Sequence, residues 1–365
     1  MTTATSAVGV NPDAFAALLC DWCLEVLERD SILVSTTPLA APLVRAFHRA
    51  AISRGAWSPA VRIAIPGLAE DFYRLAPDGL LDNYSPQEMA DVETADAFLS
   101  IQAPDNTRAL AGVDPAVITR AARALDPIRE IRLRKRWCGT LWPTPALAQQ
   151  AGMSDDDYEG FVDRALFLDQ PDPVRAWREL NDRQASLVDW LSEAREIRIE
   201  ADGTDVRLRV DGRTWINSNG KRNMPSGEVF TGPLEDSANG TIRFTIPSSL
   251  RGVPVEGVEL TFEDGKVVRA TAERGQAYLD AALATDPGAR FVGELGIGTN
   301  AGIDRPTGST LLDEKMAGTV HLALGRSYPE TGGRNASALH WDLICDLRQG
   351  GRLTADGEPI EPTGP

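Results

Sequence analysis

Two of the three histidines in this 365-residue chain lie near its C-terminus. His340 stands in the stretch SALHWDLICDL, two positions before Asp342. In a β-strand, side chains two positions apart share a face. The imidazole and the carboxylate are therefore expected side by side, with Trp341 turned into the packed interior. Such a pair can supply two ligands to one metal ion, or one ligand and the carboxylate that orients it.

His321 lies in a second apolar stretch, MAGTVHLALGRSY. An imidazole buried without a polar partner costs about 1–3 kcal/mol, so both histidines need a partner, and a metal is one they can share. Three acids lie in similar surroundings: Glu228 in PSGEVFTGP, Glu294 in FVGELGIGTN and Glu314 in LLDEKMAG. Glutamate is rarely buried unless it is paired or bound to a metal. Together with Asp342 these residues form a candidate two-metal set, whose carboxylate and imidazole donors suit Zn, Mn or Co.

The elements that carry these residues belong to a second half with β-sheet character. From residue 196 onward, apolar and polar residues alternate around Asp-Gly pairs at 202–203, 211–212 and 264–265. Such pairs are typical of tight hairpin turns, so a hairpin is expected at each. This predicts a C-terminal metal-binding domain, residues 194–365, with mixed or antiparallel sheet. The last residues, TADGEPIEPTGP, are predicted to form a loose tail.

The first half alternates apolar runs with helical segments. The runs SILVSTTP, AVRIAIPG and DAFLSIQAP flank segments such as LAAPLVRAFHRAAISRG. This alternation predicts an α/β domain with a partly parallel sheet over residues 1–193. Residues 141–195 are predicted to be mostly helical. No glycine-rich phosphate loop follows the runs, so nucleotide binding is not expected. His48 is interpreted as a surface or packing residue.

The composition excludes two classes of partner. The formal net charge is -16, with acids spread along the whole chain, which disfavours nucleic acid and anionic membranes. The sequence has no apolar window of about 18 residues that would predict a membrane span. The N-terminus lacks the features of a secretory signal, and the four scattered cysteines form no disulfide framework. A cytoplasmic location is therefore expected.

Four blocks, in this order, resemble the thermophilic-type metallo-aminopeptidases: NMPSGEVFTGP, GELGIGTN, LLDEKMAGTVHLALGRSY and SALHWDLICDL. The stretch RWCGTLWPTPALAQQAGMS extends the resemblance upstream. The resemblance implies that a metal-activated water hydrolyses the N-terminal residue of small peptides or other aminoacyl substrates. It also implies a homodimer.

The resemblance further implies two divalent ions, Zn, Co or Mn, with Glu294 bridging them. The implied ligands are Glu228, Glu294, Glu314, His321, His340 and Asp342. A catalytic role is implied for Tyr328, whose hydroxyl would donate a hydrogen bond to the substrate or to the developing oxyanion. Glu228 is the candidate to carry the proton from water to the leaving amine.

Two other functions remain open from the sequence. Ring-cleaving dioxygenases of the dihydroxypyridine type share a similar scaffold but use one Fe(II), which His321, His340 and Asp342 could hold. Such a site has no need of the three glutamates. A non-catalytic, metal-stabilised binding protein is the other alternative, although structural zinc sites usually favour cysteine.

Overall fold

The computed structural model describes residues 9–250 and 253–360, which belong to two compact units. The N-terminal unit comprises Met1–Ala176 and Gly220–Pro225, and the C-terminal unit comprises Trp177–Asn219 and Ser226–Pro365. The domain boundary expected between residues 193 and 194 stays a prediction.

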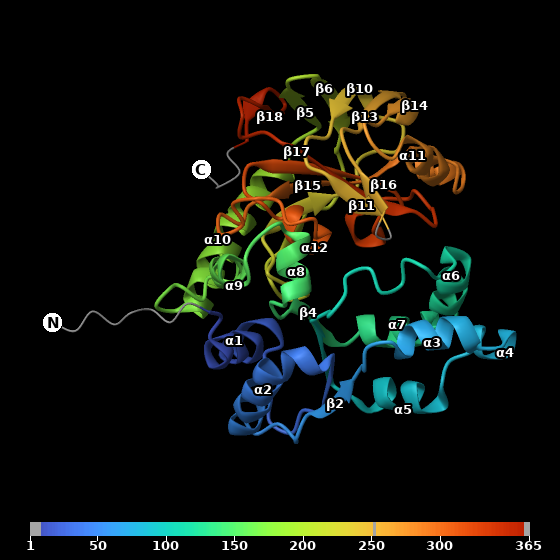
Figure 1. The fold of residues 1–365 in the computed structure, drawn as a ribbon. Coiled ribbons are helices and arrows are strands. Elements are labelled where there is room, and N and C mark those ends of the chain that lie inside the picture. Colours follow the sequence, from blue (N-terminus) through green and yellow to red (C-terminus); the bar gives the residue numbers. More distant parts are fainter. Residues whose placement is uncertain (1–8, 251–252, 361–365) are drawn as a thin grey trace. The chain divides into compact units, whose positions relative to one another are not determined.

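A parallel five-stranded sheet forms the centre of the N-terminal unit (Figure 1). The strands, in spatial order, are β2 (Ala60–Ile63), β1 (Ile32–Thr36), β3 (Ala97–Gln102), β4 (Arg136–Leu141) and β8 (Asn223–Met224). All four neighbouring pairs are parallel. The first three strands along the chain coincide with the three apolar runs, which confirms the predicted α/β fold with a parallel sheet.

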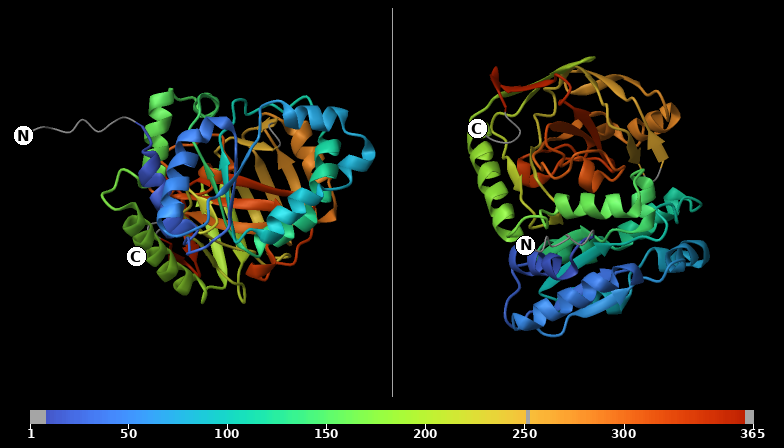
Figure 2. Two further views of the ribbon diagram at one scale, coloured as in Figure 1. Left: turned by 90° about the horizontal axis from the view of Figure 1, so that it is seen from below. Right: turned by 60° about the vertical axis from the view of Figure 1, so that its left-hand side comes forward.

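Helices lie on both sides of this sheet (Figures 1 and 2). The helices of this unit are α1 (Pro12–Leu18) with a π-helical turn (Leu19–Cys23), a 3₁₀ turn (Pro38–Ala40), α2 (Ala41–Ser53), α3 (Leu68–Leu75), α4 (Asp78–Leu81), α5 (Pro86–Thr94), α6 (Pro115–Ala124), α7 (Asp126–Leu133), α8 (Pro145–Gln150) and α9 (Asp155–Ala165). Several begin at a side chain that caps free backbone N–H groups. Asn11 caps α1, Ser85 caps α5 and Ser154 caps α9.

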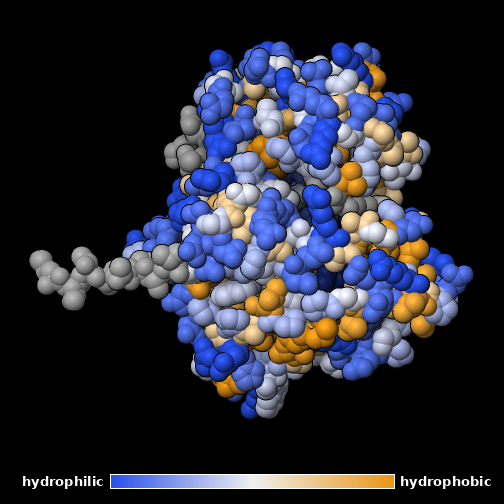
Figure 3. Space-filling view, in the orientation of Figure 1, coloured by the Kyte–Doolittle hydropathy of each residue, from blue (hydrophilic) through white to orange (hydrophobic). Residues whose placement is uncertain are grey.

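Most of the exposed large apolar side chains of the described residues lie in the N-terminal unit. Apolar side chains gather in the lower part of the space-filling view, over this unit (Figure 3). Val61 and Ile63 on the edge strand β2 are exposed, as are Leu68 and Phe72 on α3. Phe72 also lines a cavity of about 840 Å³ that α3, α5 and α6 help to form. An uncovered edge strand with apolar side chains is a favourable place for association.

Two antiparallel sheets form the C-terminal unit. The seven-stranded sheet has the order β14 (Lys266–Thr271), β13 (Glu259–Glu263), β10 (Asn239–Arg243), β6 (Thr204–Arg209), β5 (Glu196–Ala201), β18 (Arg352–Ala355) and β19 (Glu358–Pro359). The five-stranded sheet has the order β17 (His340–Asp346), β16 (Thr319–Gly325), β15 (Val292–Gly298), β9 (Glu228–Thr231) and β7 (Ile216–Ser218). A separate pair consists of β11 (Ser248–Leu250) and β12 (Val253–Val255).

One apolar core joins the two large sheets. Side chains such as Ile197 and Leu260 from one sheet and Leu295 and Leu322 from the other belong to a single buried cluster. The helices α10 (Pro173–Leu191) and α11 (Gln276–Leu283) contribute to it from opposite sides of this unit (Figures 1 and 2). The remaining elements are α12 (Thr310–Asp313) and two 3₁₀ turns, Pro287–Arg290 and Pro329–Thr331.

Two of the three expected hairpins are present. The Asp-Gly turn at 202–203 joins β5 to β6, and the turn at 264–265 joins β13 to β14. The prediction of a hairpin at 211–212 is wrong, because β6 is followed by β7, which belongs to the other sheet. The chain therefore uses this turn to change layers.

The predicted loose tail is also wrong for the residues that the structure describes. Residues 352–359 form the antiparallel pair β18 and β19, and β18 pairs with β5 along its length. The remainder of the predicted tail, 361–365, lies outside the described residues. Among the described residues, no helix is long and apolar enough to cross a membrane.

Candidate metal centre

Side chains alternate between two faces along each strand of the five-stranded sheet, so that one face is part of the core and the other is polar. Leu295, Val320 and Leu343 point into the core, so their neighbours along each strand point the other way. That second face carries five of the six expected ligands: Glu228 on β9, Glu294 on β15, His321 on β16, and His340 and Asp342 on β17. The strand register, which pairs Gly296 with His321 and Ala323 with Asp342, brings these positions into one patch.

Gly296 makes room for the His321 ring. It lies directly opposite His321 in the β15–β16 pair. A Cβ atom at this position would overlap the imidazole carbons and Nε2. The strand GELGIGTN thus needs a glycine here because a side chain crosses its surface at close range.

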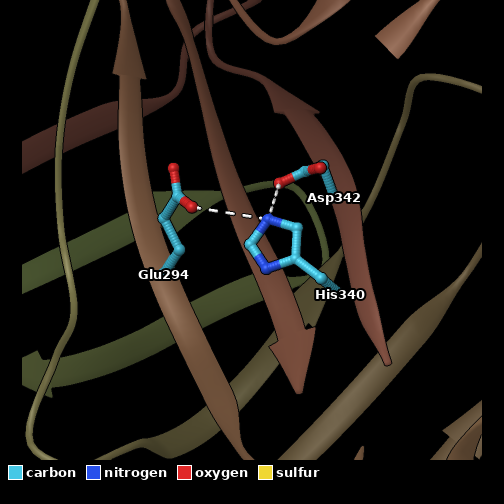
Figure 4. A group of neighbouring side chains, drawn as sticks. All are labelled: Glu294, His340 and Asp342. Atoms are coloured by element: carbon cyan, nitrogen blue, oxygen red, sulfur yellow. Dashed lines mark ion pairs between the residues drawn. The ribbon is translucent and has the colours of Figure 1, made fainter. Parts of the chain in front are cut away.

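The carboxylates and imidazoles stand at ligand-like separations. His321 Nε2 lies 3.5 Å from Glu294 Oε1 and 3.7 Å from Glu228 Oε2. His340 Nε2 lies 3.5 Å from Glu294 Oε2 and 3.7 Å from Asp342 Oδ1, as Figure 4 shows. Glu294, His340 and Asp342 each offer one donor atom, and these three atoms lie within 4.8 Å of one another. Two donors on one tetrahedral ion at about 2.0–2.2 Å stand about 3.4 Å apart.

The orientation of His340 is fixed by a backbone carbonyl. Its Nδ1 lies 2.9 Å from Arg326 O. A carbonyl oxygen only accepts, so Nδ1 donates its proton there. In the neutral ring, Nε2 then presents a lone pair toward the oxygens of Glu294 and Asp342. Lone pairs turned toward one another are stabilised when a cation lies between them, and this is the usual arrangement of a metal-binding histidine.

Two buried side-chain atoms of this cluster have no hydrogen-bond partner among the described residues. They are His321 Nδ1 and Glu228 Oε2. Glu228 Oε2 is the oxygen that faces His321 Nε2. A buried carboxylate oxygen without a donor is costly. The donor chemistry, spacing and unsatisfied oxygen therefore all fit a divalent cation.

The charges of this cluster shift its pKa values. Burial raises the pKa of Glu228 to about 7, against the opposing effect of the Lys315 ammonium. Burial, with the charge of Glu314, raises the pKa of Asp342 to about 6. For His321, burial acts to lower the pKa, but Glu294 and Glu228 outweigh it and raise the pKa to about 9. Without a metal, protons therefore compensate part of the negative charge.

Glu314 joins the cluster through Lys315, a residue that the sequence did not single out. The Lys315 Nζ donates to Glu314 Oε1 and lies 3.4 Å from Glu228 Oε1. Its side chain is completely buried. In the sequence it stands in an ordinary charged run, DEK, and such runs are usually solvated.

Tyr328 lies beside the cluster. Its ring meets the His340 ring edge-on at 5.1 Å and the Phe230 ring at 5.8 Å between centroids. Burial raises the pKa of Tyr328 above its ordinary value, and the charge of Glu294 adds to this. The hydroxyl therefore keeps its proton.

Gln184 is a second residue that sequence reasoning missed. It lies on α10, and its Nε2 donates to Glu228 O at 2.6 Å, to Asn217 Oδ1 at 3.0 Å and to Ser218 O at 3.2 Å. It thereby anchors the start of β9, where Glu228 stands. Nothing in a helical sequence pattern distinguishes such a glutamine from an exposed one. His48, in contrast, lies on α2 in the N-terminal unit, 3.1 Å from Ser58 Oγ.

Comparison with known proteins gives consistent results. The model of the thermophilic metalloprotease (M29) family matches residues 11–361. Aminopeptidase 2 of Geobacillus stearothermophilus is 34% identical, with 96% of each chain covered. Aminopeptidase T of Thermus thermophilus is 30% identical over 83% of this chain and 82% of that protein.

The fold is also similar to a solved structure, wild-type AmpT from Thermus thermophilus. The TM-score is 0.83, and the match covers 97% of this chain and 98% of that chain. At 24% sequence identity, this match shows that the folds are the same. It agrees with the α/β unit and the antiparallel unit described above.

Proposed function

The chain belongs to the thermophilic metalloprotease (M29) family, and on this premise we propose that it removes N-terminal residues from peptides at the polar face of its five-stranded sheet. It is a hydrolase, a metallo-aminopeptidase, in keeping with relatives that are aminopeptidases along nearly their whole length. Its cofactor is divalent metal. Its substrates are small peptides or other aminoacyl compounds.

The arrangement of His340 supports this site most directly. Nδ1 is committed to Arg326 O, so Nε2 is left facing two carboxylates. In a neutral ring that arrangement needs a cation. We assign Glu228, Glu294, Glu314, His321, His340 and Asp342 as the ligand set.

We further propose that the site holds two ions, with Glu294 between them. Its Oε1 faces His321 and its Oε2 faces His340, so each oxygen is directed to a different histidine. Four carboxylates and two imidazoles also exceed the four ligands of a tetrahedral zinc site. Carboxylate and imidazole donors suit Zn, Co or Mn.

Bound divalent ions supply Lewis acidity, which polarises the scissile carbonyl and lowers the pKa of water. The remaining steps fall to side chains. Glu228, a buried carboxylate of the cluster, is our candidate to take a proton from water and deliver it to the leaving amine. Tyr328, held by ring contacts with His340 and Phe230, donates its hydroxyl proton in a hydrogen bond to the developing oxyanion.

The Fe(II) dioxygenase alternative receives no support from the relatives, which are aminopeptidases. It also leaves Glu228, Glu294 and Glu314 without a role. The non-catalytic alternative is disfavoured because the ligand set is larger than four, free of cysteine and rich in carboxylates, unlike a structural zinc site.

We propose a homodimer in the cytoplasm. The exposed apolar residues of β2 and α3 support an association surface, and the four cysteines, all free, are compatible with a reducing compartment. Light scattering on the purified chain tests the assembly: a dimer mass is expected, and a monomer at micromolar concentration would contradict it.

Metal analysis combined with an aminoacyl-anilide assay tests the function itself. The expected result is two divalent ions per chain and hydrolysis of leucyl-anilide. A single oxygen-sensitive iron with ring-cleaving activity would instead support the dioxygenase.

A further inference from the structure

Lys315 is a cation built into the candidate metal centre. Its side chain has no exposed surface, and its ammonium contacts Glu314 and Glu228. Lysine is almost never fully buried unless it is paired. The mechanism described above does not use it, so its presence among the ligands needs another explanation.

The backbone holds Lys315 rigidly in this place. Its N–H donates to Leu312 O at 3.1 Å, and its carbonyl accepts from Asn300 N at 2.9 Å. A Cβ atom on Gly298 would overlap the backbone of residues 315 and 316. This close packing against the end of β15 fixes where the lysine side chain begins.

The ligand set consists of two unlike halves. In one half, the donors of Glu294, His340 and Asp342 lie within 4.8 Å of one another. In the other half, Glu228 and Glu314 share the ammonium of Lys315, beside His321. An ion entering this second half must share its carboxylates with a fixed positive charge at close range, which lowers its affinity.

We propose that Lys315 acts as a positioning residue that makes the two metal positions unequal: one ion binds tightly at Glu294, His340 and Asp342, and the second binds weakly at Glu228, Glu314 and His321. This inference rests on the proposed two-metal function. The enzyme would then keep one ion firmly and exchange the second with the available pool of divalent metal.

Titration of the chelator-treated full chain with Co²⁺ tests this inference. Equilibrium dialysis counts the bound ions, and the visible absorption of Co²⁺ follows each step. Wild type is expected to bind in two steps, the second about 100-fold weaker or more. Two equal steps in wild type would overturn the inference without any variant.

The variant Lys315→Met removes the charge and keeps much of the side-chain length. We expect the second step to tighten about 10-fold or more, and the first to change far less. Lys315→Arg, which keeps the charge, is the matched control and should retain two unequal steps. If Lys315 had only a structural role, its replacement would not change the affinity for the second ion selectively.

The possible outcomes separate this inference from the proposed function. Binding of no divalent ion overturns both. If both chains bind two ions, and the second ion binds Lys315→Met no more tightly than it binds wild type, only the role of Lys315 is overturned. One ion in wild type but two in Lys315→Met supports that role, whereas one ion in both chains contradicts it.

Discussion

Each of the two site histidines turns Nε2 toward a pair of carboxylates, and Glu294 belongs to both pairs. At the scale of single residues, this sharing distinguishes a metal centre from two ordinary ion pairs. Removal of either imidazole should therefore disturb both halves of the cluster.

His340→Ala is expected to reduce hydrolysis of leucyl-anilide about 100-fold or more, because it removes a donor whose orientation the backbone fixes. Bound metal should fall in parallel, while the circular dichroism of the fold persists. His48→Ala is the matched control, since His48 lies in the N-terminal unit and contacts Ser58. Equal activity of the two variants would rule out His340 as a ligand.

Tyr328→Phe removes only the hydroxyl and leaves the ring contacts with His340 and Phe230. Loss of one oxyanion donor typically lowers kcat about 100- to 1000-fold. We expect such a fall in kcat with unchanged metal content. Wild-type kcat in this variant would show that the hydroxyl takes no part in the reaction.

At this same scale, the sequence singled out the candidate ligands but not Lys315. Histidines and glutamates in apolar, glycine-flanked segments are anomalous, and that anomaly made them candidates. A lysine after Asp313 and Glu314 is not anomalous in sequence. Its burial arises from the packing of residues 314–316 against the end of β15, which local patterns do not encode.

At the scale of elements, the register between β15 and β16 places His321 over Gly296. Gly296→Ala is expected to push the His321 ring out of position. Overpacking of this kind costs about 1–3 kcal/mol of stability, and metal affinity should fall with it. Gly79→Ala on α4 is the control, because a Cβ there meets no atom within 4 Å. The comparison uses thermal unfolding and metal titration, and equal behaviour of the two variants would contradict the close contact.

The elements themselves were predictable where a local signal decides them. The Asp-Gly turns at 202–203 and 264–265 join neighbouring strands, and the alternation of β17 correctly separates His340 and Asp342 from Trp341, which is buried. The turn at 211–212 has the same residues but leads into the other sheet. Whether a chain reverses beside its own strand or crosses to another layer depends on long-range packing, as does the position of Gln184 against β9.

At the scale of the whole molecule, metal binding should be linked to stability and pH. Burial raises the pKa of Glu228 to about 7 and of Asp342 to about 6, and nearby carboxylates raise that of His321 to about 9. In each case the metal-free folded chain binds protons more tightly than the unfolded chain. The stability from these groups is therefore present at low pH and lost as pH rises from about 5 to 9.

Metal replaces these protons, so the stabilisation by metal should grow with pH. We expect the difference in Tm between metal-loaded and chelated protein to be small at pH 5.5 and larger at pH 8.5. At a free metal concentration about 100 times Kd, the stabilisation amounts to about 2.7 kcal/mol. A difference in Tm that shrinks as pH rises would contradict the linkage.

The central claim is that divalent metal on the polar face of the five-stranded sheet carries out aminopeptidase chemistry. The most direct measurement is hydrolysis of a leucyl peptide by the full chain after exhaustive chelation, followed by stepwise addition of Zn²⁺, Co²⁺ or Mn²⁺. We predict no hydrolysis without metal, and restored release of the N-terminal residue as metal binds. Full activity of the chelated, metal-free chain would contradict the claim.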